Sequence, residues 1–256
     1  MRAIWAIASC MIKQLIRRKD FYVLLIFLLV LLGLLSSQTF FALEEVSRYI
    51  RDFGYFMVVF FSLIIAVTFA AKQIPEEIDN RTIYPLLAKP IDRATVILGK
   101  YCGSVLVSVF SFMVFYAAYL VFYLTSGTGG SFVLATQGFL MGVLFLFLVS
   151  ALVIFFSNFL TTSANITLSL LIYMLISGFS ESLRELVLYS KGLMAAVTST
   201  LYYMIPHFDF YDMRVRITHA WDPLPFWVMG TITLYTLIYS SMLLYFAGLL
   251  FRRRKL

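Results

Sequence analysis

Residues 101–180 read YCGSVLVSVFSFMVFYAAYLVFYLTSGTGGSFVLATQGFLMGVLFLFLVSALVIFFSNFLTTSANITLSLLIYMLISGFS and contain no Asp, Glu, Lys or Arg. One helical crossing of a bilayer takes about 20 predominantly apolar residues, so this stretch is long enough for three. It has two polar breaks, TSGTGGS at 125–131 and SNFLTTSAN at 157–165. Clusters of Gly, Ser, Thr and Asn mark turns between regular elements. We therefore expect three membrane helices, at about 101–124, 132–156 and 164–182.

Three further uncharged runs flank this stretch, at residues 21–43, 53–71 and 223–251. They predict helices over about 21–43, 54–72 and 226–250, which gives six spans in all. The six prolines, at 75, 85, 90, 206, 223 and 225, all fall between these spans, where a missing backbone N–H does least harm. Only 13% of the residues are charged, about half the share in soluble domains. The sequence thus predicts an all-α membrane protein, with residues 1–256 forming one transmembrane domain.

The distribution of basic residues predicts the orientation in the membrane. Basic residues on the side of the N-terminus are Arg2, Lys13, Arg17, Arg18, Lys19, Lys72, Arg81, Lys89, Arg93, Lys100, Arg252, Arg253, Arg254 and Lys255. Those on the other side are Arg48, Arg51, Arg184, Lys191, Arg214 and Arg216. Loops rich in Lys and Arg stay in the cytoplasm. We therefore expect a multi-pass protein of the inner or plasma membrane with both termini cytoplasmic. The net charge of +7 reflects this orientation, and we expect no nucleic-acid partner.

Two segments outside the spans have helical patterns. In residues 1–20, Ile4, Ile7, Met11 and Leu15 share one helical face opposite a basic one, which predicts an amphipathic helix in the membrane interface. It is either an elbow that braces the first span or a plain surface anchor. Residues 183–225 are predicted to form an extracytoplasmic helical segment rich in aromatic residues. That segment is either a docking face for an external partner protein or an aromatic belt at the interface.

The segment between the second and third spans, residues 73–100, interrupts the apolar sequence. Pro75 followed by two glutamates is typical of a helix start, because acidic residues favour the positive end of the helix dipole. Pro90 breaks the chain, and Asp92 is a suitable N-cap for a helix that continues into the third span. A short amphipathic helix here needs a surface for its apolar side, either the membrane or a partner protein. A plain connecting hairpin is the alternative.

This segment resembles the signature of the ABC-2-type permease family, the membrane subunits of ATP-binding-cassette transporters. Family members have an acidic pair, Gly-Thr, Leu-Leu, a Pro-hydrophobic-x-Arg motif and Leu-Gly-Lys at the start of the third span. The matching residues here are Glu77, Asp79, Thr82, Leu86, Leu87, Pro90, Ile91, Arg93, Leu98, Gly99 and Lys100. Arg81 stands where the family usually has Gly. The stretches 202–214 and 249–256 are also similar to the family, so the resemblance covers essentially the whole chain.

The resemblance implies the permease subunit of an ABC exporter, whose segment 73–100 docks on a separate cytoplasmic ATPase subunit. The residues expected to serve this coupling are Glu76, Glu77, Asp79, Thr82, Leu86, Leu87, Lys89, Pro90, Arg93, Gly99 and Lys100. ATP and Mg²⁺ would be bound by the partner. A second permease copy or a homologue would complete a homodimer or heterodimer. Close helix packing there is expected through small residues, namely Gly33, Ser36, Ser37, Ala164 and Ser169.

The motifs of a catalytic chain are missing from the sequence. No G-x-x-x-x-G-K-[ST] phosphate loop, H-E-x-x-H, G-x-S-x-G or C-x-x-C motif occurs, so we expect no catalytic residue, no metal site and no cofactor in this chain. Two other functions stay open: a membrane scaffold or assembly factor, and an ATP-independent secondary transporter. The second of these is disfavoured because the central spans carry no ionisable residue and the prolines lie outside the spans. The transported substrate is not identifiable from the sequence.

The predicted topology can be tested by cysteine labelling. Lys89→Cys and Phe210→Cys, each in a chain without Cys10 and Cys102, are treated with a membrane-impermeant maleimide in vesicles of known orientation. We expect the cysteine at 89 to react only from the cytoplasmic side and the cysteine at 210 only from the other side. Reaction at 210 from the cytoplasmic side would overturn the six-span topology.

Overall fold

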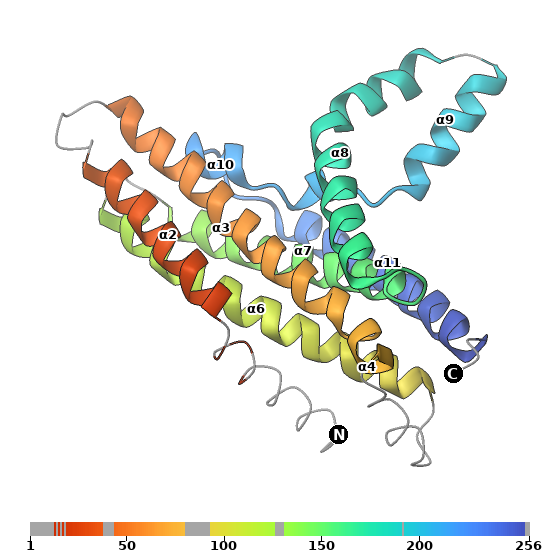
Figure 1. Cartoon of the computed structure of the whole chain (residues 1–256). Coiled ribbons are helices and arrows are strands. Elements are labelled where there is room, and N and C mark those ends of the chain that lie inside the picture. The colour runs from red at the N-terminus through yellow and green to blue at the C-terminus, as the bar shows by residue number, and fades with distance from the viewer. Residues whose placement is uncertain are drawn as a thin grey trace.

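The computed structural model describes residues 13, 15, 17, 19–37, 44–79, 93–125, 131–190 and 192–253, and these residues form helices joined by short connections, without a strand. The elements in Figure 1 are α2 (Lys19–Ser37), α3 (Glu44–Lys72), α4 (Pro75–Asp79), α6 (Arg93–Thr125), α7 (Phe132–Phe156), α8 (Thr162–Tyr189), α9 (Leu193–Met204), the 3₁₀ helix η2 (Phe208–Tyr211), α10 (Arg214–Thr218) and α11 (Phe226–Arg253). The predicted all-α fold is confirmed.

Five helices in the described part of the chain are long and apolar enough to cross a membrane. They cover Arg51–Lys72, Ala94–Leu124, Phe132–Phe156, Thr162–Ser180 and Phe226–Phe251, and each coincides with an expected span. The sixth expected span corresponds to α2, whose apolar part, Phe21–Leu34, is shorter. Residues 38–43, which would complete that span, lie outside the described residues, as does most of the expected interfacial helix at 1–20. The sixth span therefore stays a prediction.

Several helices extend beyond the uncharged runs that predicted them. The second expected span was placed at 54–72, whereas α3 begins at Glu44. The third was placed at 101–124, whereas α6 begins at Arg93, which confirms a helix that continues into the span. Glu, Arg and Lys are good helix formers, so a helix continues through charged residues once it has left the apolar layer. Only α7, at 132–156, matches its expected bounds at both ends.

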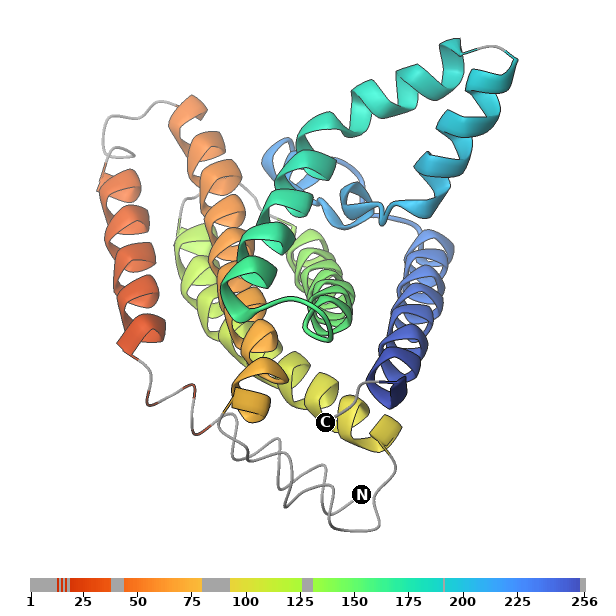
Figure 2. The ribbon, with the colours of Figure 1, turned by 45° about the vertical axis from the view of Figure 1, so that its right-hand side comes forward.

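The core of the bundle is α7. It packs against α3, α6 and α11 (Figures 1 and 2). α2 lies against α3 and α6, and α8 packs on α3 and α7. Buried positions occur all round α7 because its apolar residues occupy every face. We call the end where α2 and α6 begin and where α3 and α11 finish the terminal end. The opposite end carries η2, α10 and a projecting α8–α9 hairpin, and we call it the hairpin end (Figure 2).

Two glycines of α7 permit close approach of its neighbours, Gly142 that of α6 and Gly138 that of α10. A Cβ atom added at Gly142 would collide with the ring of Phe112, which is 1% exposed and stacks on Phe139 at a centroid distance of 5.5 Å. A Cβ at Gly138 would lie 2.8 Å from Cδ1 of Ile217. Small residues permit this proximity, and dispersion between packed side chains is a main source of helix association in lipid.

Phenol groups fasten α7 to its neighbours. The hydroxyl of Tyr116 donates to the Ala135 carbonyl at 2.6 Å, that of Tyr55 to Gly138 at 3.2 Å, and that of Tyr101 to Phe147 at 3.3 Å. Each phenol lies on α3 or α6, and each acceptor is a backbone carbonyl on α7. Carbonyl oxygens have two lone pairs, so they accept these bonds in addition to the helical ones.

The short connection from α7 to α8, residues 157–161, has its polar groups bonded to the adjoining helix ends. Ser157 Oγ donates to Ile154 O at 2.7 Å and Asn158 Nδ2 to the same oxygen at 3.0 Å. Asn165 Nδ2 donates to Val153 O at 3.0 Å, and Ser169 Oγ donates to Asn165 Oδ1 at 3.1 Å. Ser169 is therefore buried inside this chain, and the expectation that it faces a second copy is wrong, because its hydroxyl serves an internal amide.

The side chain of Gln137 joins α7 to the connection before α11. Gln137 Nε2 donates to Leu224 O at 2.8 Å, and the Leu224 N–H donates to Gln137 Oε1 at 2.9 Å. Leu224 lies between Pro223 and Pro225, so its N–H is the single backbone donor of that tripeptide. One amide side chain thus satisfies both backbone groups of Leu224.

The substitution Gly142→Ala tests the α6–α7 contact. We expect it to destabilise the purified chain by about 1–3 kcal/mol, because the Phe112 ring is packed on both sides and overpacking a core costs this much. Thermal unfolding in detergent measures the change. Gly230→Ala on α11 is the matched control, since a Cβ added there meets no neighbouring side chain or helix within 4 Å. Equal stability of both variants would show that the contact is not tight.

The substitution Gln137→Leu tests the bond to Leu224. The loss of both bonds leaves two backbone groups unpaired, which costs about 1–3 kcal/mol when they are buried. We expect faster proteolysis within residues 219–225 as well as a lower midpoint of thermal unfolding. Thr136→Val is the control, because the Thr136 side chain is exposed and bonds only to its own helix. Unchanged proteolysis in Gln137→Leu would contradict the assignment.

Candidate functional site

The terminal end carries α4, the first part of the segment expected to contact an ATPase. α4 follows α3 after a turn at Gln73 and Ile74, in which Gln73 N–H donates to Ala70 O and Ile78 N–H to Ile74 O, both at 3.2 Å. The Ile74 side chain is 3% exposed. Its burial holds α4 against the end of α3.

An ion pair also joins the two helices at this turn. Lys72 Nζ lies 3.8 Å from Glu76 Oε1, but both side chains are substantially exposed. Exposed pairs of this kind contribute about 0–1 kcal/mol. The apolar burial of Ile74 therefore contributes more than the charges to the position of α4.

The structure places only some of the predicted coupling residues. Glu76, Glu77 and Asp79 lie in α4, and Arg93 is the first residue of α6. The residues between these helices lie outside the described part of the chain, namely Thr82, Leu86, Leu87, Lys89 and Pro90. Gly99 and Lys100 are in the first turns of α6. The coupling role of all these residues stays a prediction.

The start of α6 presents one member of its Leu-Gly-Lys triplet outward. Leu98 is 47% exposed, whereas Gly99 and Lys100 are buried. Leu98 and Ala94 line a shallow apolar groove of about 330 Å³ against the last turns of α11, including Leu244 and Leu249. Leu98 is thus the residue of the triplet that can contact another molecule, while Lys100 is enclosed by this chain.

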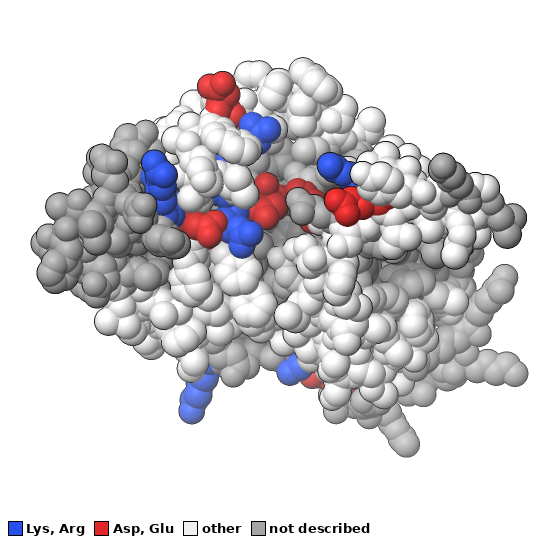
Figure 3. Space-filling model, turned by 90° about the horizontal axis from the view of Figure 1, so that it is seen from above, with Lys and Arg blue, Asp and Glu red and all other residues white. Residues whose placement is uncertain are grey.

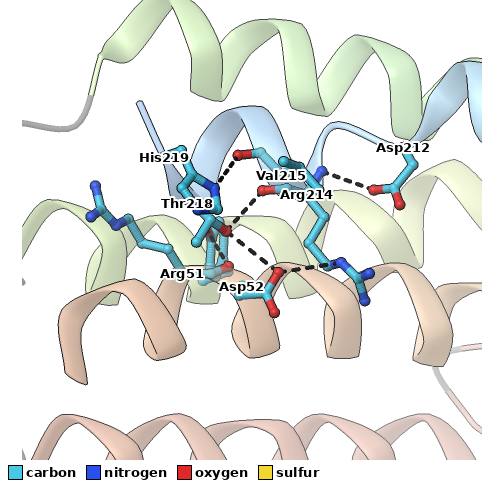
Figure 4. Close-up of polar contacts among 8 residues, drawn as sticks. Arg51, Asp52, Asp212, Arg214, Val215, Thr218 and His219 are labelled. Atoms are coloured by element: carbon cyan, nitrogen blue, oxygen red, sulfur yellow. Dashed lines mark hydrogen bonds and ion pairs between the residues drawn. The ribbon is translucent and has the colours of Figure 1, made fainter. Parts of the chain in front are cut away.

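The hairpin end holds a polar cluster that joins α10 to α3 (Figure 4). Asp52 Oδ1 lies 3.2 Å from Arg214 Nε and 3.4 Å from Thr218 Oγ1. The Thr218 hydroxyl also lies 2.8 Å from Arg214 O, and Arg214 N–H donates to Asp212 Oδ1 at 2.8 Å. In Figure 4 the Arg51 side chain points away from this cluster. Seen from above, acidic and basic side chains gather over this end between apolar surfaces (Figure 3).

Residues 205–217 form a cap that is fixed to α11 as well. Tyr235 Oη accepts from the His207 N–H at 3.1 Å, and the hydroxyls of Tyr211 and Thr236 are 2.7 Å apart. Burial lowers the pKa of His207, although the nearby Asp209 carboxylate opposes that shift. The His207 ring stacks on Phe210 at a centroid distance of 5.2 Å. His207 is therefore a neutral packing residue at pH 7.

A cavity of about 80 Å³ lies beneath this cap, between α3, α7 and α8. Its walls include six aromatic rings, those of Tyr55, Phe56, Phe145, Tyr173, Phe208 and Tyr211. The rest of the lining consists of Val59, Gly142, Ser177, Asp209, Asp212 and Arg214. The sequence predicted an aromatic-rich outer segment but not this cavity, because its walls come from helices far apart in the chain. The one feature of the sequence that could have drawn attention to this site is the pair of acidic residues, Asp209 and Asp212, among aromatic residues.

The described residues give no sign of metal chemistry. Within them, no group of three His, Cys, Asp or Glu side chains comes together as a possible metal site. The ionisable groups at the hairpin end are instead engaged in contacts between elements, such as the one from Asp52 to Arg214. The arrangement can hold helices in place and can accommodate a small molecule under the cap.

Comparison with known proteins identifies one family. Residues 5–256 match the family model described as ABC-2 family transporter protein. A comparison with curated proteins finds no match. The match covers nearly the whole chain, including both helices that flank segment 80–92 and the cap at the hairpin end. Together with five helices suited to crossing a membrane, it shows a multi-pass membrane protein of the permease type. The chain belongs to the ABC-2 family of transporter membrane proteins.

Proposed function

We propose that this chain is the permease subunit of an ABC exporter, which forms the translocation pathway and is driven by a separate cytoplasmic ATPase subunit. The observation that carries the proposal is the family match over residues 5–256. The missing phosphate loop supports it, because a chain without that loop depends on a partner for ATP and Mg²⁺. The chain lies in the inner or plasma membrane, and its terminal end is on the cytoplasmic side, as the distribution of Lys and Arg indicates.

The helices at the terminal end are suited to transmit movement of an ATPase. α4 is held directly against the end of α3, and α6 has 33 residues, which corresponds to about 50 Å of continuous helix. A displacement of segment 80–92 is thus applied to two long helices that pack on each other along the bundle. Such helices move as rigid bodies, so the displacement reaches the hairpin end.

A second permease copy, or a homologue, completes the pathway. Only 11% of the membrane-spanning part of α8 is buried within this chain, against 61% for α7. Gly33 on α2 and the exposed Ala164 on α8 keep the backbones of these two helices accessible. Small residues at accessible positions permit close helix association in lipid. The dimer contact therefore involves α2 and α8.

Segment 80–92 can be tested with the double substitution Leu86→Ala and Leu87→Ala. If these leucines are the apolar anchors of the docked segment, each truncation costs more than about 1 kcal/mol. We expect at least a tenfold loss of ATPase co-purification, or substrate-stimulated hydrolysis that no longer drives transport. Thermal unfolding and topology should be unchanged.

The matched control is Leu186→Ala with Leu188→Ala, two exposed leucines at the hairpin end. This variant should keep ATPase binding and transport at wild-type levels. If the Leu86/Leu87 variant also keeps both while folded, the segment is only a connection. If the wild-type chain recovers no ATP-binding partner at all, it acts as a scaffold or assembly factor instead.

A further inference from the structure

We propose that the hairpin-end cavity binds an organic cation, of the class of quaternary and primary ammonium compounds. The proposal goes beyond transport, and it does not depend on the identity of the ATPase. It rests on three features of the cavity: its aromatic walls, the excess of carboxylates around it and its size.

Half of the residues that line the cavity are aromatic. Phe145 contacts Tyr173, Phe208 and Tyr211 at centroid distances of 5.5, 5.7 and 6.1 Å, so four rings enclose one side of the cavity. The hydroxyl of Tyr211 is bonded to Thr236, and that of Tyr55 is bonded to Gly138. These two hydroxyls are thus engaged elsewhere, and a group of aromatic rings attracts a cation through the quadrupole of each ring.

The charges around the cavity favour a cation over an anion. Two carboxylates, those of Asp209 and Asp212, and one guanidinium, that of Arg214, line the cavity. Arg214 is already paired with Asp52 at 3.2 Å, and its Cζ lies 5.8 Å from the centre of the Phe56 ring. An anion would have to compete with Asp52 for the guanidinium. A cation instead meets the negative charges of Asp209 and Asp212, which are exposed and can take it up alongside their existing contacts.

The other titratable groups near the cavity do not change its preference for a cation. Burial raises the pKa of Tyr211 to about 12, despite the opposing hydrogen bond with Thr236, so its phenol is neutral. His207, with its lowered pKa, adds no positive charge. Arg216 is directed to the opposite side of α10, where its Nη1 donates to Asp222 O at 3.0 Å.

The volume limits the ligand to a small head group. In this measure about 10–15 Å³ is enough for one water, so a cavity of about 80 Å³ holds a group of several heavy atoms. A trimethylammonium or primary ammonium group fits this space, with the remainder of its molecule outside the cavity. Such groups occur both in soluble amines and in zwitterionic lipid head groups, and the chemistry of recognition is shared.

Choline is the probe, and 3,3-dimethylbutan-1-ol is its neutral isostere. Both are titrated by saturation-transfer NMR against the full chain, with any co-purifying subunits, in nanodiscs of phosphatidylglycerol alone. We expect choline to bind at least tenfold more tightly than the isostere. Asp209→Asn with Asp212→Asn should weaken choline at least tenfold and leave the isostere unchanged. The amide oxygen introduced at position 212 can still accept the Arg214 N–H, so the cap should remain folded.

Asp222→Asn is the matched control, since Asp222 lies on the same end of the molecule but outside the cavity lining. It should leave choline affinity unchanged. If the double variant is poorly folded, Tyr173→Leu replaces it and should weaken choline about fivefold through the lost ring. Equal binding of choline and its isostere, unchanged affinity in the double variant, or no choline binding would each overturn the proposal.

A second experiment distinguishes a soluble amine from a lipid head group as the source of the cation. Nanodiscs that contain phosphatidylcholine should show undiminished binding of soluble choline if the ligand enters from the aqueous side. Loss of soluble choline binding in those discs would show that the lipid head group occupies the cavity. Either result supports the assignment of a cation site.

Discussion

A single constraint underlies the structure: polar groups within the bundle must find partners inside it, because lipid offers none. α7 shows how the chain meets this requirement. Its backbone is internally bonded and its sides are apolar. Phenols on α3 and α6, and the Asn165 amide on α8, donate to its carbonyls. The side chain of Gln137, the long polar group that α7 itself buries, is fully engaged with Leu224. The positions of α3, α6 and the cap all follow from contacts with this helix.

The spans were predictable because apolar length is a local property. The 25 residues of α7 were located to the residue, since turn-forming polar clusters bound an uninterrupted apolar run on both sides. The start of α3 was missed because charge marks where a helix leaves lipid and not where it stops, whereas the start of α6 agrees with the N-cap expected at Asp92. The bonds of Ser169 were also beyond prediction. Whether a small side chain faces a partner copy or an internal amide depends on the rotation of α8, which one sequence does not determine.

The functional features at the two ends of the bundle were not equally predictable from the sequence. At the terminal end, the segment 73–100 carried recognisable motifs in consecutive order, and the family match agrees with that interpretation. At the hairpin end, the important contacts join residues far apart in the chain, such as Asp52 and Arg214. A pattern of hydrophobicity cannot pair two charges that are separated by several helices. The aromatic cavity is missed for the same reason, since its walls come from α3, α7, α8 and η2.

The short connection between α7 and α8 has a consequence for biosynthesis. α8 is the least apolar of the five membrane-spanning helices, and α7 is the most apolar. As a separate segment, α8 would be a weak signal for insertion by the translocon. The five-residue connection keeps the start of α8 beside the end of α7 once α7 has entered the bilayer, and there Asn165 bonds to Val153. The two helices should therefore partition into the bilayer as one hairpin, with α7 supplying the free energy that α8 lacks.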